Sequence, residues 1–243
     1  MKDAAAAYQM ALLWKLTGTE QYAKNVINIL NQWAATCTEV TSNDANHKLA
    51  AGAQGYTFAN AAEIMQTYDG WTEADQTTFK TWIVKVFASK NKDFLDNHQG
   101  SSNCALHYWS NWDLVNMCSY LSIGILTEDD DMVNYVVNYF YNGAGNGALN
   151  NLIQGTHIDP LSNEEICQNQ ESGRDQGHAQ MSAAVTANLC QIAYTFYQDN
   201  KDVSRLDFFA ANNNAIMKMG EYVALSNATD GMKNDNSDGI WLI

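Results

Sequence analysis

The near absence of proline is the feature that most constrains how this chain can fold. Its 243 residues include one proline, Pro160, whereas proteins average about 5% proline. Proline interrupts helices because it lacks a backbone N–H and because its ring clashes with the preceding turn. A chain almost free of proline can therefore form long, uninterrupted helices.

Apolar residues recur at helical spacing along most of the chain. Helices are predicted over residues 4–16, 48–67, 72–88, 105–126, 128–141, 172–197 and 207–226, and a further one begins after Thr19. A polar stretch at 89–103 follows the fourth helix, the region 154–171 is predicted to be irregular, and Gly143–Gly147 is predicted to form a loop. No series of alternating strands stands out. The predicted fold class is all-α, with about eight helices whose short turns indicate a bundle or an α/α toroid.

The composition favours one globular domain over residues 1–243. Hydrophobic residues make up 46% of the chain, which is enough for a sizeable core. The net charge of −14 argues against duplex nucleic acid as a partner, because binding phosphates needs a basic face. The longest apolar runs are too short to span a membrane. The oligomeric state is left open.

The five cysteines form no CxxC pair, which excludes a zinc ribbon or a thioredoxin motif. We expect them to be buried as small hydrophobic residues, since free cysteine is among the most buried residue types. A single disulfide is the alternative, if the protein is secreted.

The segment at 103–113 collects polar and aromatic side chains just after a predicted loop. If a helix covers this segment, His107 and Asn111 lie on one face at i, i+4 spacing. Tyr108 and Trp112 share the neighbouring face by the same spacing. The alternative is a structural role, in which the tryptophans belong to the core and His107 is a hydrogen-bonded buried histidine.

The segment at 168–181 is the second candidate. Arg174 and His178 are again at i, i+4 spacing, in a chain with only 13 lysines and arginines. Ser172 is predicted to cap the following helix, with Asp175 as the return partner of a capping box. That structural role of Asp175 competes with a catalytic one.

These residue types suit β-elimination on a uronate sugar. The reaction removes a weakly acidic proton next to a carboxylate, so a cation or an amide must neutralise that carboxylate. A histidine or tyrosine can take the proton, and a tyrosine can protonate the leaving oxygen. The sequence shows no metal-binding motif and no P-loop, so we expect neither a metal nor a cofactor.

Three segments resemble the alginate lyase-like family of polysaccharide lyases. They are HYWSNWDL at 107–114, GAGNG at 143–147 and ESGRDQGH at 171–178. The helix pair between Trp14 and Trp33 and the stretch from Gln54 to Ile64 are also similar to the family. The similarity covers about residues 5–225, and its most specific part is ESGRDQGH.

The resemblance implies an (α/α) toroid, or an incomplete barrel of helical hairpins, that cleaves an anionic uronate polymer and leaves an unsaturated sugar end. Family members usually carry a secretion signal, so we expect a secreted or periplasmic protein, although no signal is visible near Met1. A closed toroid needs more helices than 243 residues readily supply, which leaves open a truncation at one or both ends.

The resemblance and the residue chemistry together assign roles. Arg174 and Asn111 are predicted to neutralise the carboxylate, and His107 or His178 to act as the base. Better-studied alginate lyases carry a tyrosine after the arginine, whereas here Tyr108, or else Tyr56, is predicted to supply the phenol. Residues predicted to bind sugar are Gln54, Tyr56, Asn60, Trp109, Trp112, Gln170, Glu171 and Gln176.

Three other functions stay open at this point. A toroid glycoside hydrolase needs two carboxylates that flank the bond, and Asp113, Glu171 and Asp175 are the candidates. A non-catalytic carbohydrate-binding protein would bind a uronate polymer and release no product. The third alternative is a purely structural helical array.

Overall fold

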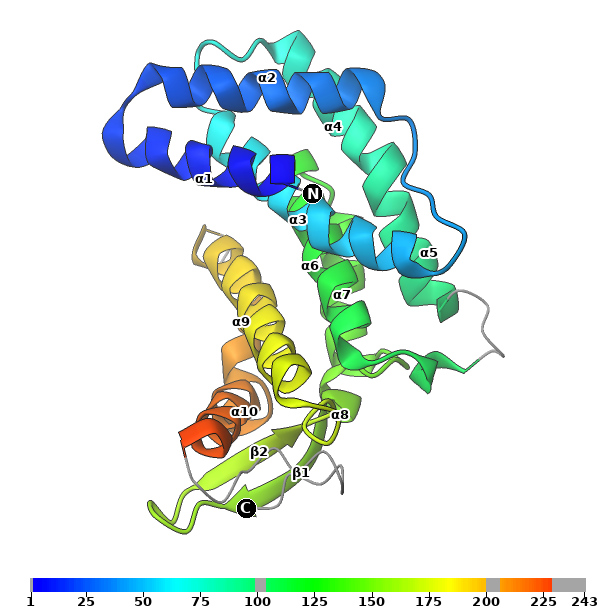
Figure 1. Cartoon of the computed structure of the whole chain (residues 1–243), viewed down its shortest axis with the longest axis vertical. Helices are drawn as coiled ribbons and strands as arrows, with labels where there is room; N and C mark the ends of the chain where they lie inside the picture. The colour runs from blue at the N-terminus through cyan, green and yellow to red at the C-terminus, as the bar shows by residue number, and fades with distance from the viewer. Residues whose placement is uncertain (1, 99–103, 200–205, 229–243) are drawn as a thin grey trace. The chain divides into compact units, whose positions relative to one another are not determined.

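The computed structural model describes residues 2–98, 104–199 and 206–228 (Figure 1). The chain divides into two compact units. The first unit comprises Met1–Gln99 and Val115–Val136, and the second comprises Gly100–Leu114 and Val137–Ile243. Helices dominate the described residues of both units, so the predicted all-α class is confirmed. The toroid and the single domain stay predictions.

The first unit begins with helices that run close to the predicted ranges. They are α1 (Lys2–Thr17), α2 (Glu20–Thr36), α3 (Asn46–Met65), α4 (Glu73–Ile83) and α5 (Ser89–Asn97). Helices α1 and α2 form an antiparallel hairpin (Figure 1). Ala4, Ala7 and Ala11 are the buried residues of α1, and these small side chains let the backbones of neighbouring helices approach.

The helix that begins after Thr72 runs further than predicted. The Thr72 hydroxyl caps it by accepting from the Asp75 N–H at 3.1 Å. A π-helical turn at Val84–Ala88 then leads directly into α5. The predicted helix end near residue 88 was wrong. The polar stretch that follows still forms α5, because α5 buries an apolar face that includes Phe94.

Aromatic rings form the centre of the first unit. Phe58, Trp82 and Phe87 pack against one another with ring centroids 5.3–6.0 Å apart. Edge-to-face and tilted contacts of this kind add to the free energy gained from burial alone.

Helices α6 (Ser110–Thr127) and α7 (Asp130–Asn142) each contribute residues to both units. Their lengths follow the predicted ranges, but α6 begins later than expected. A short 3-10 turn at Ala105–His107 precedes it, and Tyr108 has an extended backbone with φ −93° and ψ 148°. His107 and Tyr108 therefore do not share helix faces with Asn111 and Trp112, which corrects the prediction from their spacing.

The second unit contains the one sheet among the described residues. After the short α8 (Leu149–Leu152), strands β1 (Ile153–Ile158) and β2 (Glu165–Asn169) pair antiparallel, with Thr156 opposite Cys167. The stretch 154–171 was predicted to be irregular, and this hairpin corrects that prediction. Its alternation is weak because β1 has exposed residues on both faces.

Helices α9 (Gln176–Asp199) and α10 (Ala211–Ala228) follow the hairpin. They lie side by side in Figure 1, and α10 also packs on β2 through Tyr222 and Val223, which bury Ile166. The first residues of α10 include three asparagines with left-handed backbone angles, Asn212–Asn214. Asparagine tolerates this conformation better than most residues.

All five cysteines are free thiols, so the alternative of one disulfide is contradicted. Cys118, Cys167 and Cys190 are buried as predicted, whereas Cys37 is half-buried and Cys104 is exposed. Within the described ranges, no helix is both long and apolar enough to cross a membrane.

Candidate active site

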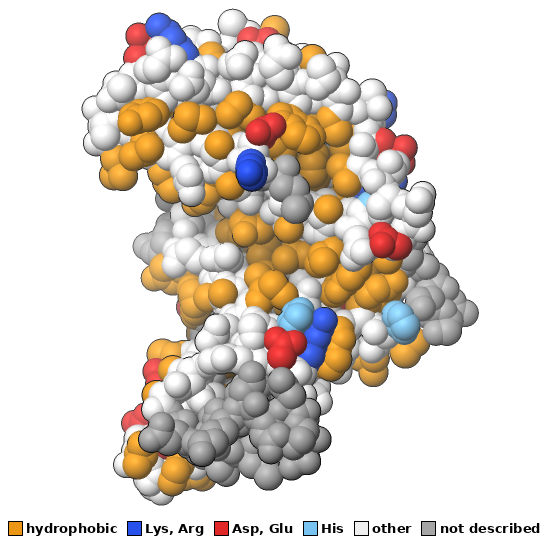
Figure 2. All heavy atoms as spheres, viewed as in Figure 1, with side chains coloured by type: hydrophobic (Ala, Val, Ile, Leu, Met, Phe, Trp, Pro, Cys, Tyr) orange, Lys and Arg blue, Asp and Glu red, His pale blue; other side chains and the backbone are white. Residues whose placement is uncertain are grey.

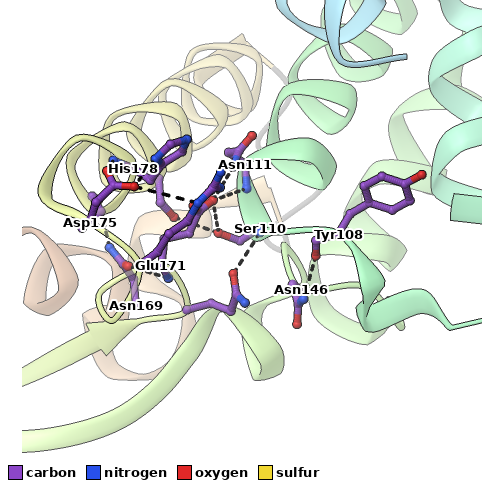
Figure 3. Close-up of polar contacts among 12 residues, drawn as sticks. Tyr108, Ser110, Asn111, Asn146, Asn169, Glu171, Asp175 and His178 are labelled. Carbon is purple, nitrogen blue, oxygen red and sulfur yellow. Dashed lines mark hydrogen bonds and ion pairs between the residues drawn. The ribbon is translucent and has the colours of Figure 1, made fainter. Parts of the chain in front are cut away.

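A fully buried carboxylate, Glu171, organises the polar residues of the second unit (Figure 3). Its Oε1 accepts hydrogen bonds from the Asn111 N–H at 2.9 Å, the Asn111 side-chain amide at 2.5 Å and the Ser110 hydroxyl at 3.2 Å. Its Oε2 accepts from Arg174 Nη1 at 3.1 Å. The two candidate segments of the sequence therefore meet at this side chain.

The residues around Glu171 also cap helix α6. The side-chain oxygen of Gln170 accepts from the Ser110 N–H at 3.0 Å, and Glu171 takes the next N–H of the helix. The first N–H groups of a helix have no partner within it, and negative charge is favourable near that end. Gln170 and Glu171 were predicted to bind sugar. Both side chains bind the start of α6, and the burial of Glu171 argues against its direct contact with a substrate.

Asn169, which the sequence analysis did not single out, fixes the turn that carries Glu171 and Arg174. Its Oδ1 accepts from the Glu171 N–H at 3.0 Å and from the Ser172 hydroxyl at 3.1 Å. Its amide donates to the Ala179 carbonyl at 3.1 Å. An asparagine that begins a turn commonly bonds the backbone two residues on, and this was the available signal in the sequence.

Asp175, and not Ser172, caps α9. Its Oδ1 accepts from the His178 N–H at 2.8 Å, the bond expected of an N-cap side chain. Its Oδ2 lies 2.5 Å from Nδ1 of the same histidine. The hydrogen bond from the His178 backbone N–H is the main reason why the pKa of Asp175 lies below its usual value, and the nearby imidazole and guanidinium add to the effect.

The pairing with Asp175 orients the imidazole of His178. With Nδ1 turned onto the carboxylate, Nε2 is the nitrogen left to accept a proton, because the partner of one ring nitrogen sets the role of the other. The His178 side chain is 35% exposed, so solvent and ligands can reach it. A carboxylate that orients an exposed histidine is a common arrangement for a general base.

Arg174 lies between two carboxylates and an indole ring. Besides the contact with Glu171, its Nε is 3.9 Å from Asp175, and its guanidinium carbon lies 4.8 Å from the centre of the Trp109 ring. The Arg174 side chain is 28% exposed. Figure 2 shows a basic, an acidic and a histidine side chain gathered among apolar side chains on one face.

Tyr108 does not join this cluster. Its side chain points away from Glu171 and His178 (Figure 3). The centroid of its ring lies 4.9 Å from that of the His107 ring and 4.7 Å from that of the Trp112 ring. Burial raises the pKa of the Tyr108 phenol. His107, Tyr108 and Trp112 thus form a separate row of rings.

The GAGNG loop at 143–147 contacts the residues around the start of α6. The Asn146 amide donates to the Tyr108 carbonyl at 2.7 Å, and the Gly147 N–H donates to Asp113 at 3.1 Å. Asp113 is fully buried and also accepts from the Tyr139 hydroxyl at 2.7 Å. The loop predicted from the sequence is therefore present, and it holds the start of α6.

The remaining predicted sugar-binding residues are divided between the two units. Gln54, Tyr56 and Asn60 are half-buried on α3 in the first unit, where burial raises the pKa of Tyr56. Gln176 is exposed at the start of α9 and donates to Asn227. Their roles in binding stay predictions.

A comparison with known protein families shows the family to which the chain belongs. A family model described as Alginate lyase matches residues 1–232, nearly the whole chain. The chain belongs to the alginate lyase family. None of the curated proteins compared matches it. Membership of the alginate lyase family implies a polysaccharide lyase with a polysaccharide substrate. It also confirms the resemblance to this family that was stated from the sequence.

Proposed function

We propose that this alginate lyase family member cleaves a uronate-containing anionic polysaccharide, alginate-like or glucuronan-like, by β-elimination. A base removes the proton on the carbon next to the uronate carboxylate. The electron pair forms a carbon–carbon double bond, the bond to the leaving sugar oxygen breaks, and that oxygen takes a proton. The product carries an unsaturated uronate end.

The observation that carries this proposal is the pair of oriented groups on one turn. Arg174 is held by Glu171, and His178 is held by Asp175. A fixed cation next to an oriented imidazole supplies the two needs of the first step, which are neutralisation of the carboxylate and removal of its neighbouring proton. We assign the first role to Arg174 and the second to His178.

Asn111 and His107 have weaker support for direct roles. Asn111 is 2% exposed and turns its amide onto Glu171, which favours a supporting role over contact with the substrate. His107 is exposed and packs against the Tyr108 ring. We therefore favour His178 over His107 as the base.

The acid that protonates the leaving oxygen is a tyrosine in this proposal. A tyrosine phenol is protonated at neutral pH because its ordinary pKa is about 10, as a general acid requires. Burial raises the pKa of Tyr56 and of Tyr108 further. Tyr108 lies on the same segment as Trp109 and Trp112, whose rings we propose as sugar platforms. Comparing Tyr108→Phe with Tyr56→Phe assigns the role, because the true acid loses turnover and the other tyrosine keeps it.

The hydrolase alternative has less support. It needs two carboxylates that reach the sugar bond, yet Asp113 and Glu171 are fully buried and occupied by hydrogen bonds. Asp175 is accessible but paired with His178. We also propose that the enzyme acts outside the cytoplasm, where polymers of this kind occur.

The direct experiment incubates the protein with alginate, glucuronan and other uronate polymers and follows the ultraviolet absorbance of the unsaturated product. Wild type is expected to produce it from at least one polymer, and His178→Ala and Arg174→Ala to reduce it strongly. His47→Ala is the matched control. His47 is, like His178, a half-buried histidine whose Nδ1 has a hydrogen-bond partner, the Asp44 carbonyl, but it lies on α3 and has no proposed role in the reaction. Saturated ends would indicate a hydrolase, and binding without product a non-catalytic protein.

A further inference from the structure

Glu171 is buried like a residue of the core, yet it contacts Arg174, the cation that we assign to the reaction. It is fully buried, and its two oxygens bind different partners. Oε1 accepts three hydrogen bonds from Ser110 and Asn111 at the start of α6, whereas Oε2 accepts from Arg174. One buried charge therefore joins the first turn of α6 to the guanidinium.

We propose that Glu171 is a positioning residue that fixes the orientation in which Arg174 meets the substrate carboxylate. This inference rests on the proposed lyase function. Nη1 of Arg174 faces Glu171, and Nε faces Asp175 at 3.9 Å. Nη2 is the nitrogen that remains for a substrate, and the Trp109 ring at 4.8 Å limits the tilt of the guanidinium plane.

The contact restricts the arginine more than the carboxylate. A buried carboxylate is unfavourable unless hydrogen bonds compensate it, and the donors of α6 already supply three such bonds to Glu171. Asn169 further fixes the backbone by accepting from the Glu171 N–H. Arg174, by contrast, is 28% exposed, and a long side chain at such a site samples many rotamers unless it is held.

Positioning of this kind acts on turnover. A cation that neutralises charge developing in the transition state works only if it is aligned beforehand, and a displacement of about 1 Å can cost on the order of 10²-fold in rate. Glu171→Gln keeps the size of the side chain and removes the charge that holds Arg174. We expect kcat to fall on the order of 10²-fold with a smaller change in KM, because the lost interaction is made in the transition state.

The chain offers a readout that does not depend on activity. It contains two arginines, Arg174 and Arg205, so a protein labelled with ¹⁵N-arginine gives two sets of guanidinium Nη–H signals, which Arg174→Lys assigns. Nη1 of Arg174 is the nitrogen that donates to Glu171, and its N–H signal is the one followed. In wild type the Arg174 signal is expected to exchange slowly with water. In Glu171→Gln it is expected to exchange fast, because the guanidinium is released.

Asp113→Asn is the matched control, since Asp113 is also a fully buried carboxylate at the start of α6 and binds Tyr139 and Gly147. Its Arg174 signal is expected to match wild type even if its melting temperature falls. Should Glu171→Gln fail to fold, Glu171→Asp replaces it, because the shorter side chain keeps the charge but cannot reach both partners.

The outcomes separate this inference from the proposed function. The positioning role is overturned if the Arg174 N–H still exchanges slowly with water in the Glu171 variants, or if it exchanges fast in Asp113→Asn as well. An unchanged kcat in Glu171→Gln also overturns it. If wild type forms no unsaturated product from any polymer, the lyase proposal fails, and the Arg174 signal alone then decides whether Glu171 holds the guanidinium.

Discussion

At the scale of single residues, carboxylates hold the two functional candidates of the second unit. Glu171 binds Arg174 from the interior, and Asp175 binds His178 at the surface. The sequence analysis identified all four residues in one segment. It could not assign their partners, because the partners of Glu171 on α6 lie 60 residues away in the chain.

The charge on Asp175 makes the stability of the protein depend on pH. Its pKa is lowered in the folded state, chiefly by the His178 backbone N–H. The unfolded chain therefore takes up the proton first, near the ordinary value of about 3.9, and stability that is present above this pH is lost as pH falls toward the folded pKa.

Asp175→Asn tests this dependence while keeping an N-cap, since asparagine caps helices about as well as aspartate. We expect wild type to be the more stable protein near neutral pH and the difference to shrink below about pH 4. Denaturant unfolding at a series of pH values measures it. A constant difference across that range would contradict the assignment.

The cysteines differ in accessibility, which predicts their reactivity. Burial raises the pKa of Cys190 to about 12 and also raises that of Cys167, whereas Cys104 is exposed. Because the thiolate is the reactive form, we expect alkylation of the native protein to modify Cys104 first. Peptide mass spectrometry identifies the site, and early modification of Cys190 would contradict the fold of α9.

At the scale of elements, the positions of most helices could be predicted from the sequence, whereas the starts of α6 and α9 could not. Periodicity placed α1, α3, α7 and the start of α2 within a few residues, because each has a regular buried face. The starts of α6 and α9 depend on the hydrogen bonds of Gln170, Glu171 and Asp175. The cap of α6 comes from a segment 60 residues away in the chain and leaves no trace in local spacing. The hairpin alternates too weakly to be recognised from its sequence.

The contact between the GAGNG loop and α6 leads to a prediction about packing. A Cβ at Gly147 would lie 2.4 Å from the Asp113 Cβ, whereas a Cβ at Gly220 would meet nothing within 4 Å. Gly147→Ala should therefore destabilise the fold by about 1–3 kcal/mol through overpacking. Gly220→Ala is the control, and it should stabilise α10 by about 0.4–1 kcal/mol.

Thermal or denaturant unfolding of the two glycine variants gives both free energies. Equal effects at the two positions would mean that the loop does not pack against Asp113. A loss of stability in Gly147→Ala alone would support the close approach that the structure describes.

At the scale of the whole molecule, the charge of −14 does not oppose an anionic substrate. Electrostatic interactions between exposed charges are largely screened beyond about 10 Å at moderate salt. Under the proposed function, a uronate would meet locally the guanidinium of Arg174 beside His178. Family membership was predictable from three segments, whereas the polymer, the mode of cleavage and the acid depend on arrangements that no local pattern encodes.

Formation of the unsaturated uronate by His178→Ala and Arg174→Ala, compared with wild type and His47→Ala, tests the central claim most directly. The account predicts strong absorbance from wild type and from His47→Ala on at least one uronate polymer. It predicts a loss of two or more orders of magnitude, roughly the contribution of a general base, in the other two variants. Full activity in both of them would contradict the proposed roles of these residues.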